Sequence, residues 1–208
     1  MKDTELFDSH FFMKRGLFIS ILMTVFISLR AHSQDELDRF NDTLKMGTSY
    51  LIGQRMRQYD LTGMDGKLYS SSQLKGKVTF IGFLTEFCAP CVAETPALNQ
   101  LYSDFKADSN FQYLSFTIEN WGNPTAFIRK HQIEYPVLSV DIGTCYYLNY
   151  FKGFPVHMIV GPDGKILYFQ FGGGINEQKA VENLKGNVYP VIKQQLMRLY
   201  TSSDEKEE

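Results

Sequence analysis

The stretch VTFIGFLTEFCAPCVAETPAL, residues 78–98, joins a strand pattern directly to a helix pattern. Its first part, Val78 to Leu84, is a continuous run of apolar, β-branched and aromatic residues, which is typical of a strand covered on both faces. From about Ala89 to Ala107, apolar residues recur at helical spacing, and Pro96 is expected to kink that helix. The stretch therefore predicts a strand–helix unit with two cysteines at the junction.

The rest of the chain supplies more units of this kind. Strands are predicted at Met56–Leu61, Lys67–Tyr69, 111–118, 137–140, 156–160 and 166–171. Helices are predicted at 71–74, 123–131, 145–151 and 177–199, the last interrupted near Gly186 and Pro190. Strands and helices that alternate before a final β-hairpin and helix predict an α/β domain over residues 51–200. We expect this domain to contain a central mixed sheet with helices on both faces, and to carry an N-terminal β-hairpin extension.

The N-terminus carries an export pattern. Lys14-Arg15 precedes the apolar run Gly16–Leu29, and the A-x-S sequence of Ala31–Ser33 suits signal-peptidase cleavage. We expect residues 1–33 to be a signal peptide, with Met13 as an alternative start, and the protein to be periplasmic and soluble after cleavage. The apolar run is shorter than the roughly 20 residues of a transmembrane helix, and an uncleaved anchor is the alternative.

The net charge, the cysteine count and the length of the domain limit the functions that the chain can have. The net charge of −2 gives no indication of a nucleic-acid partner, and the 208 residues contain three cysteines. A polar lead-in segment at 34–50 precedes the domain, and a charged tail at 201–208 is expected to be disordered. The domain is long enough to bury a real core without a disulfide scaffold, so the cysteines are available for chemistry.

Two cysteines separated by two residues at a helix start suit thiol–disulfide exchange. Cys88 lies at the predicted N-terminus, where free N–H groups and the macrodipole favour an anion by roughly 0.3–2 kcal/mol. Cys91, one turn further on, can resolve a mixed disulfide. A permanent disulfide around so small a loop gains little, and zinc usually needs four ligands, whereas His131 and His157 are distant in sequence. The pattern favours exchange over both alternatives.

Other residues have more open interpretations. Glu94 lies three residues after Cys91, so it is either a buried acid that exchanges a proton with Cys91 or a solvated helix charge. Pro155 opens a predicted strand. Cys145 is interpreted as a buried, small apolar residue, and His157 as a core or pocket histidine.

Three motifs carry a family resemblance. They are LTGMDGKLYSSSQLKGKV at 61–78, FCAPCVAETPAL at 87–98 with its C-x-x-C-x-x-E-x-P spacing, and KGFPVHMIVGPDGKI at 152–166. In this order they resemble the TlpA/ResA-like thioredoxins, exported bacterial thiol–disulfide oxidoreductases of the redoxin/AhpC-TSA superfamily. The resemblance spans residues 52–171 and implies a thioredoxin fold.

The resemblance also implies roles for individual residues. Cys88 becomes the attacking thiol, Cys91 the resolving thiol and Glu94 the active-site acid. The bond between Phe154 and Pro155 is expected to be cis and to face the disulfide, where neighbouring backbone would bind an extended substrate. The implied substrate-binding residues are Phe87, Ala89, Pro90, Phe154 and Pro155.

The implied partners are disulfide-containing proteins, with apocytochrome c as a candidate, and a membrane thiol reductant; no cofactor or metal is implied.

The chain departs from the family at three places. Phe87 stands where Trp is usual, Val156 replaces the common Thr, and Gly82 stands where cytoplasmic thioredoxins keep a buried acid. Glu94 is then the acid left near the pair. These departures concern redox potential and substrate choice rather than the fold.

Two other functions compete. The sequence TEFC, from Thr85 to Cys88, matches the T-x-x-C core of a peroxiredoxin-like thiol peroxidase, but Ile81 stands where that motif has proline. A non-catalytic thioredoxin-fold binding module would keep the cysteine pair as an inert bridge. The leading prediction is an exported oxidoreductase that reduces protein disulfides, with the direction of electron flow left open.

Overall fold

The structure is a computed structural model that describes residues 23–26, 28, 30 and 47–204. The chain divides into two units, Met1–Gly47 and Thr48–Glu208. In the first unit the described residues are helical and exposed. Most of the predicted signal peptide and lead-in segment lies outside the described residues. Within the described ranges, no helix combines the length and hydropathy that a membrane crossing requires.

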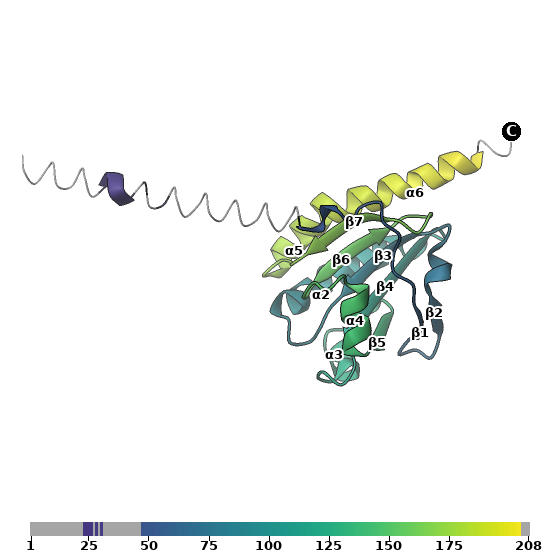
Figure 1. The fold of residues 1–208 in the computed structure, drawn as a ribbon, viewed down its shortest axis with the longest axis horizontal. Coiled ribbons are helices and arrows are strands. Elements are labelled where there is room, and N and C mark those ends of the chain that lie inside the picture. The colour runs from purple at the N-terminus through teal and green to yellow at the C-terminus, as the bar shows by residue number, and fades with distance from the viewer. Residues whose placement is uncertain (1–22, 27, 29, 31–46, 205–208) are drawn as a thin grey trace, which may run out of the picture. The chain divides into compact units, whose positions relative to one another are not determined.

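The second unit is built on a five-stranded mixed sheet (Figure 1). Its strand order is β5-β4-β3-β6-β7. β3, β4 and β5 run parallel, while β6 is antiparallel to both β3 and β7. The strand bounds are β3 Val78–Phe83, β4 Phe111–Ile118, β5 Val137–Val140, β6 Val156–Val160 and β7 Ile166–Phe171. The predicted parallel part with an antiparallel edge is confirmed.

Helices cover both faces of this sheet, as predicted (Figure 1). One apolar cluster joins one sheet face to α2 (Ala89–Phe105), α3 (Pro124–Lys130), α5 (Glu177–Asn183) and α6 (Tyr189–Asp204). The other cluster joins the opposite face to α4 (Ile142–Leu148) and to the segment before β3. Pro96 lies within α2, and a kink at that position stays a prediction.

The C-terminal helix is interrupted where Gly186 was expected to weaken it. The π-helical turn η2 (Leu184–Val188) lies between α5 and α6, and Pro190 follows it as the second residue of α6. The helix continues to Asp204, past the start of the predicted tail. The Thr201 hydroxyl donates to the Met197 carbonyl and supports this last turn.

The N-terminal hairpin is present but begins later than predicted. β1 spans Asp60–Thr62 and pairs antiparallel with β2 (Leu68–Ser70), followed by the 3-10 turn η1 (Ser71–Leu74). Met56 and Tyr59 are buried without strand pairing, and the Met56 N–H donates to the Gly164 carbonyl. Their apolar pattern reflects docking onto the main core, so the strand predicted at Met56–Leu61 is wrong at its start.

The helix predicted at Cys145–Phe151 is wrong by three residues, because α4 begins at Ile142. The Asp141 side chain accepts a hydrogen bond from the Thr144 N–H and caps the helix start. The helix ends where Tyr150 and Phe151 adopt positive φ values of 59°.

Candidate active site

The two cysteines lie where β3 ends and α2 begins. Cys88 is the N-cap of α2, and its Sγ accepts a hydrogen bond from the Cys91 N–H at 3.2 Å. The two residues form a disulfide. Cys91 is 1% exposed, Cys88 is half-buried and the intervening Ala89 is exposed. The geometry therefore presents the first sulfur to solvent and shields the second.

Glu94 lies one turn after Cys91 and is 0% exposed. The Gly174 N–H donates to its Oε1 at 2.8 Å, and Nε2 of His157 lies 3.2 Å from its Oε2. Burial of a carboxylate is costly unless such donors compensate for lost water. The alternative interpretation of Glu94 as a solvated helix charge is wrong.

The glycine run after β7 encloses this carboxylate. A Cβ added at Gly173 would lie 2.7 Å from Oε2 of Glu94 and closer still to Oε1. A Cβ at Gly174 would collide with the backbone of Ala180, at the start of the C-terminal helices. The loop thus needs glycine at both positions, because the backbone itself packs against the acid and donates to it.

His157 is the site residue whose position sequence reasoning missed. It is 1% exposed in β6 and pairs in register with Gly82 of β3. Its ring centroid lies 5.5 Å from that of Phe80. The expectation of a buried histidine is confirmed, but its contact with Glu94 was not foreseen. One signal was available: His157 lies two residues after Pro155, and alternation in a strand places both on the face that packs against α2.

Tyrosines surround the buried acid. Burial, with a contribution from the charge of Glu94, raises the pKa of Tyr168 to about 12. Burial likewise raises the pKa of Tyr113 and of Tyr135 well above the usual value, and their rings stack with centroids 4.5 Å apart. These hydroxyls stay protonated at neutral pH, so they add polarity around Glu94 without adding charge.

Ser115 occupies the space that Gly82 leaves open. A Cβ on Gly82 would lie 2.8 Å from the Ser115 Oγ, and the two residues are register partners on β3 and β4. The position at which cytoplasmic thioredoxins keep an acid therefore holds a small hydroxyl beside the glycine. Among the residues implied for the site, Glu94 alone carries a buried carboxylate, and it comes from α2 itself.

An exposed aromatic row borders the disulfide. Phe87, directly before the first cysteine, is 63% exposed, and Trp121, in the loop after β4, is 43% exposed. Their ring centroids lie 6.2 Å apart, and that of Trp121 lies 6.4 Å from that of Phe154. The Phe154–Pro155 bond is cis and directly precedes β6. Trp121 was absent from the predicted site, because it is distant in sequence from the motifs that mark the site.

The third cysteine lies elsewhere. Cys145 is 0% exposed within α4, among apolar side chains on the opposite face of the sheet. Burial, followed by the charge of Asp141, raises the pKa of its thiol to about 12. In the part of the chain that the structure describes, no group of three or more His, Cys, Asp or Glu residues is arranged to hold a metal ion.

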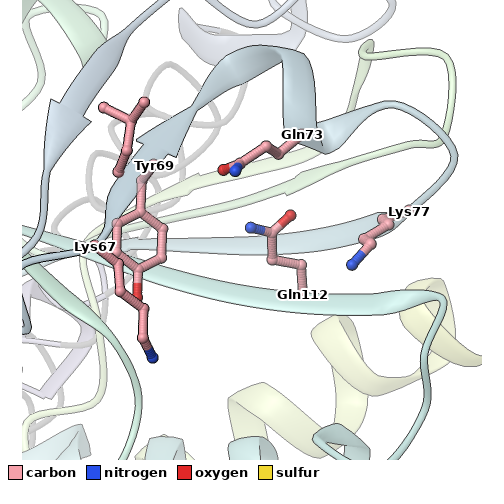
Figure 2. A pocket seen from close by; sticks show the side chains of 6 residues that line it. Lys67, Tyr69, Gln73, Lys77 and Gln112 are labelled. Atoms are coloured by element: carbon pink, nitrogen blue, oxygen red, sulfur yellow. The ribbon is translucent and has the colours of Figure 1, made fainter.

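A hollow of about 450 Å³ lies at the other end of the strands (Figure 2). Lys77 directly precedes β3 and Gln112 is the second residue of β4, so this hollow lies at the amino ends of strands whose carboxyl ends point toward the cysteine pair. The β1–β2 hairpin contributes Lys67 and Tyr69. The hollow shares no residue with the predicted redox site.

Comparisons with known proteins agree with this geometry. The model of the AhpC/TSA family matches residues 52–169. The thiol-disulfide oxidoreductase ResA of a Bacillus cereus strain is 27% identical over 129 residues, which cover 61% of this chain and 73% of that protein. The ResA of Bacillus anthracis is 26% identical over the same length and coverage.

Solved structures show the same fold. A thiol:disulfide interchange protein of the thioredoxin family from Chlorobium tepidum TLS superposes with a TM-score of 0.55 at 20% identity, covering 69% of this chain and 97% of that one. A thiol-disulfide oxidoreductase from Bacteroides fragilis NCTC 9343 gives a TM-score of 0.53 at 20% identity, covering 66% and 99%. With its thioredoxin fold and its cysteine pair at the start of α2, this chain belongs to the AhpC/TSA family and is an oxidoreductase of the ResA type.

Proposed function

We propose that the protein is an exported reductase of protein disulfides that works through Cys88 and Cys91. The observation that carries the proposal is the cysteine pair at the start of α2 with a fully buried carboxylate one turn further on. In the dithiol state, Cys88 is the attacking thiolate, favoured by the helix N-terminus and by the Cys91 N–H. Its sulfur bonds to one substrate sulfur, and the other leaves as a thiolate that takes a proton from solvent.

Resolution of this mixed disulfide needs a base. The S–H of Cys91 gives its proton to Glu94, and the resulting thiolate attacks the sulfur of Cys88. The enzyme disulfide forms, the bond from Cys88 to the substrate breaks, and the second substrate sulfur leaves with the electron pair and is protonated. Two electrons and two protons thus pass from the enzyme dithiol to the substrate disulfide. A membrane thiol reductant then restores the dithiol.

The aromatic row supports protein substrates. Phe87, Trp121 and Phe154 form an apolar strip beside the half-buried first sulfur, and the exposed Ala89 adds no charge. Such a strip suits an unfolded, apolar segment on either side of a substrate cysteine. Pro90 and Pro155 complete the proposed substrate surface, and apocytochrome c is a candidate substrate.

Export rests on the sequence pattern alone. Basic residues, an apolar run and the A-x-S sequence of Ala31–Ser33 support removal of residues 1–33. N-terminal sequencing of the protein from periplasmic extract is expected to start near Gln34. Mature protein that begins well before Gln34 would contradict cleavage at this point.

The test of the function is reduction of a model protein disulfide by the full chain, with dithiothreitol as the reductant. Cys88→Ser is expected to lose at least about a hundredfold in rate, because the nucleophile is gone. Cys91→Ser is expected to accumulate the mixed disulfide. Undiminished activity of Cys88→Ser would end the proposal, and stoichiometric peroxide consumption by the wild type would instead support the peroxidase alternative.

The direction of electron flow is tested separately by equilibrating the pair in glutathione buffers. A potential near that of thioredoxin, about −270 mV, supports a reductase, whereas one near about −120 mV would assign an oxidase. A pair that never exchanges would indicate a binding module.

A further inference from the structure

We propose that a chain of side-chain amides holds the glycine loop against Glu94, and that Gln170 is the positioning residue at the end of this chain. The glycine loop is Gly172–Gly174, directly after β7, and the amides are those of Asn187, Asn183 and Gln170. The inference rests on the proposed function and deepens it, because it assigns a part in resolution to residues outside the cysteine motif.

The glycine loop needs support from outside itself. Three consecutive glycines have no side chains to pack, and glycine loses more conformational freedom on folding than any other residue. Gly172 has a φ of 84°, in the left-handed region, and Ile175, directly after the loop, is 82% exposed. Yet the Gly174 N–H donates to Oε1 of the buried Glu94 at 2.8 Å. A flexible segment keeps such a hydrogen bond only if other contacts hold it in place.

Gln170 makes that contact at the start of the loop. Its Nε2 donates to the Gly172 carbonyl oxygen at 3.2 Å, while the Gly172 N–H donates to the Pro155 carbonyl at 2.9 Å. These two bonds fix the peptide planes on both sides of Gly172. Because peptide units are planar, only the φ and ψ of Gly173 separate the fixed carbonyl from the Gly174 N–H. The Gln170 amide therefore sets the direction of the N–H that bonds to the buried acid.

The loop carbonyl also determines how every amide in the chain is oriented. The Gly172 carbonyl can only accept, so the Gln170 atom facing it is the nitrogen. Oε1 of Gln170 accepts from the Tyr168 hydroxyl and from Nδ2 of Asn183, the latter at 3.1 Å. Oδ1 of Asn183 in turn accepts from Nδ2 of Asn187 at 2.7 Å. Reversing one amide would set two donors or two acceptors against each other, so all three point the same way and strengthen one another.

The amide chain connects the loop to the helices that follow it. Asn183 is the last residue of α5, and Asn187 lies in the π-helical turn η2. Gln170 and Asn183 are half-buried, whereas Asn187 is exposed. The far end of the loop has its own anchor, because the Asn176 side chain accepts the Lys179 N–H and caps α5. Gln170 and Asn176 thus hold the loop from its two sides.

The proposed resolution step depends on this support. In the mixed disulfide, the S–H bond of Cys91 breaks, its proton moves to Glu94, and its sulfur bonds to that of Cys88. The substrate sulfur leaves with the electron pair of the broken disulfide bond and is protonated. When the loop moves, the carboxylate loses its N–H donor and its fixed orientation, so it meets the Cys91 proton less often. The attack by Cys88 precedes this step and needs no proton acceptor. Loss of the amide chain should therefore slow resolution and spare attack.

The first test measures attack and resolution separately in the full chain. The reduced protein is mixed with oxidised glutathione, quenched with acid at intervals and weighed by mass spectrometry, in which the mixed disulfide carries the added mass of glutathione. Gln170→Leu is expected to slow resolution about tenfold and to leave attack within about twofold of wild type. Asn183→Leu, one step further from the loop, should slow resolution about threefold. Gln178→Leu, which removes an α5 amide that donates to Glu182, is the matched control and should change neither rate.

A second measurement follows the loop itself. Exchange of the Gly174 amide with deuterium is measured by NMR in the oxidised protein. In Gln170→Leu this amide should exchange at least about tenfold faster, while the amides of β4 keep their wild-type rates. A variant that is merely less stable would speed exchange at both places.

Equal slowing of attack and resolution in Gln170→Leu would overturn the proposal, and so would a wild-type exchange rate at Gly174. An effect of Gln178→Leu as large as that of Gln170→Leu would do the same. Wild-type protein that never forms the mixed disulfide would refute the proposed function instead, and exchange at Gly174 would still decide whether the amides hold the loop. If Gln170→Leu does not fold, Asn183→Leu decides by the same two measurements.

Discussion

The starts of α2 and α4 are built alike but behave differently. Each helix has a side-chain cap, Cys88 in α2 and Asp141 in α4, and each carries a buried cysteine about one turn later. Cys91 is 1% exposed and Cys145 is 0% exposed. In α2 the capping atom is itself a sulfur, so the buried cysteine has a partner. The comparison teaches that burial at a helix start does not by itself give a cysteine a partner: Cys91 forms a disulfide with its capping residue, whereas Cys145 stays a free thiol.

The surroundings of the two buried thiols differ as well. Cys91 lies one helical turn before the buried Glu94, whose Oε1 accepts the Gly174 N–H and whose Oε2 lies 3.2 Å from Nε2 of His157. Cys145 lies among apolar side chains, and burial raises the pKa of its thiol to about 12. The buried thiol of α2 thus shares its helix with a buried acid, whereas the buried thiol of α4 is surrounded by apolar side chains.

Glu94→Gln should have the largest effect, because it removes the carboxylate that distinguishes the surroundings of Cys91 from those of Cys145. The amide keeps the shape of the side chain but cannot take the proton of Cys91, so resolution is expected to slow by about a hundredfold while the attack by Cys88 continues. Mass spectrometry of the quenched reaction should show the mixed disulfide accumulating. Glu86→Gln, a nearby carboxylate that accepts from the Asn123 N–H, is the matched control. Resolution at the wild-type rate in Glu94→Gln would remove the acid from the mechanism.

Cys145 should resist thiol reagents in the folded protein. In the reduced native protein at about pH 8, iodoacetamide is expected to modify Cys88 and to leave Cys145 unmodified until the protein unfolds, because burial keeps its thiol protonated and covered. Equal labelling of the two residues would contradict the contrast between the helix starts.

The pKa of Cys145 also gives a stability prediction with a definite sign. The folded value of about 12 lies above the usual value of 9.0 for a free thiol. The stabilising contribution is therefore complete below about pH 9 and is lost as pH rises toward 12. Between about pH 8 and pH 10.5, the wild type should lose about 2 kcal/mol more unfolding free energy than Cys145→Ala, measured by urea denaturation. The tyrosines are common to both chains and cancel.

Exposed aromatic residues, one beside the start of α2 and one after the end of α4, offer the smallest test. Trp121→Ala should raise KM for a protein disulfide by about threefold to tenfold and leave the rate with a small disulfide unchanged, because it removes apolar contact and no reacting group. Phe151→Ala, at the end of α4, is the matched control with a 68% exposed ring. Equal effects of the two substitutions would show that the row beside the disulfide has no special role.

Much of the fold could be predicted, because its strands are local patterns. Four strands match their predicted bounds at 111–118, 137–140, 156–160 and 166–171. The failures arose where apolar side chains serve another purpose. Met56 and Tyr59 are buried without strand pairing. The aromatic run after Cys145 suggested a helix that in fact begins earlier, at its Asp141 cap.

The cysteine pair and the acid were also foreseeable, because their spacing along one helix is part of the sequence. The contact between Glu94 and His157 was not. It depends on the antiparallel register that sets His157 opposite Gly82, and no local pattern encodes that register. The aromatic row has the same origin, since it brings together Phe87, Trp121 and Phe154 from three separate loops.

Gly173 and Glu94 are distant in sequence, but the residue types that they can accommodate depend on each other. Any side chain at position 173 would occupy the volume of the Glu94 carboxylate, so the acid could no longer stay where it is. An alanine at 173 would therefore force the Glu94 carboxylate to move away from the loop. In a protein redesigned from this scaffold, a single added methyl group in the loop after β7 would therefore displace the buried carboxylate without altering any residue of the cysteine motif.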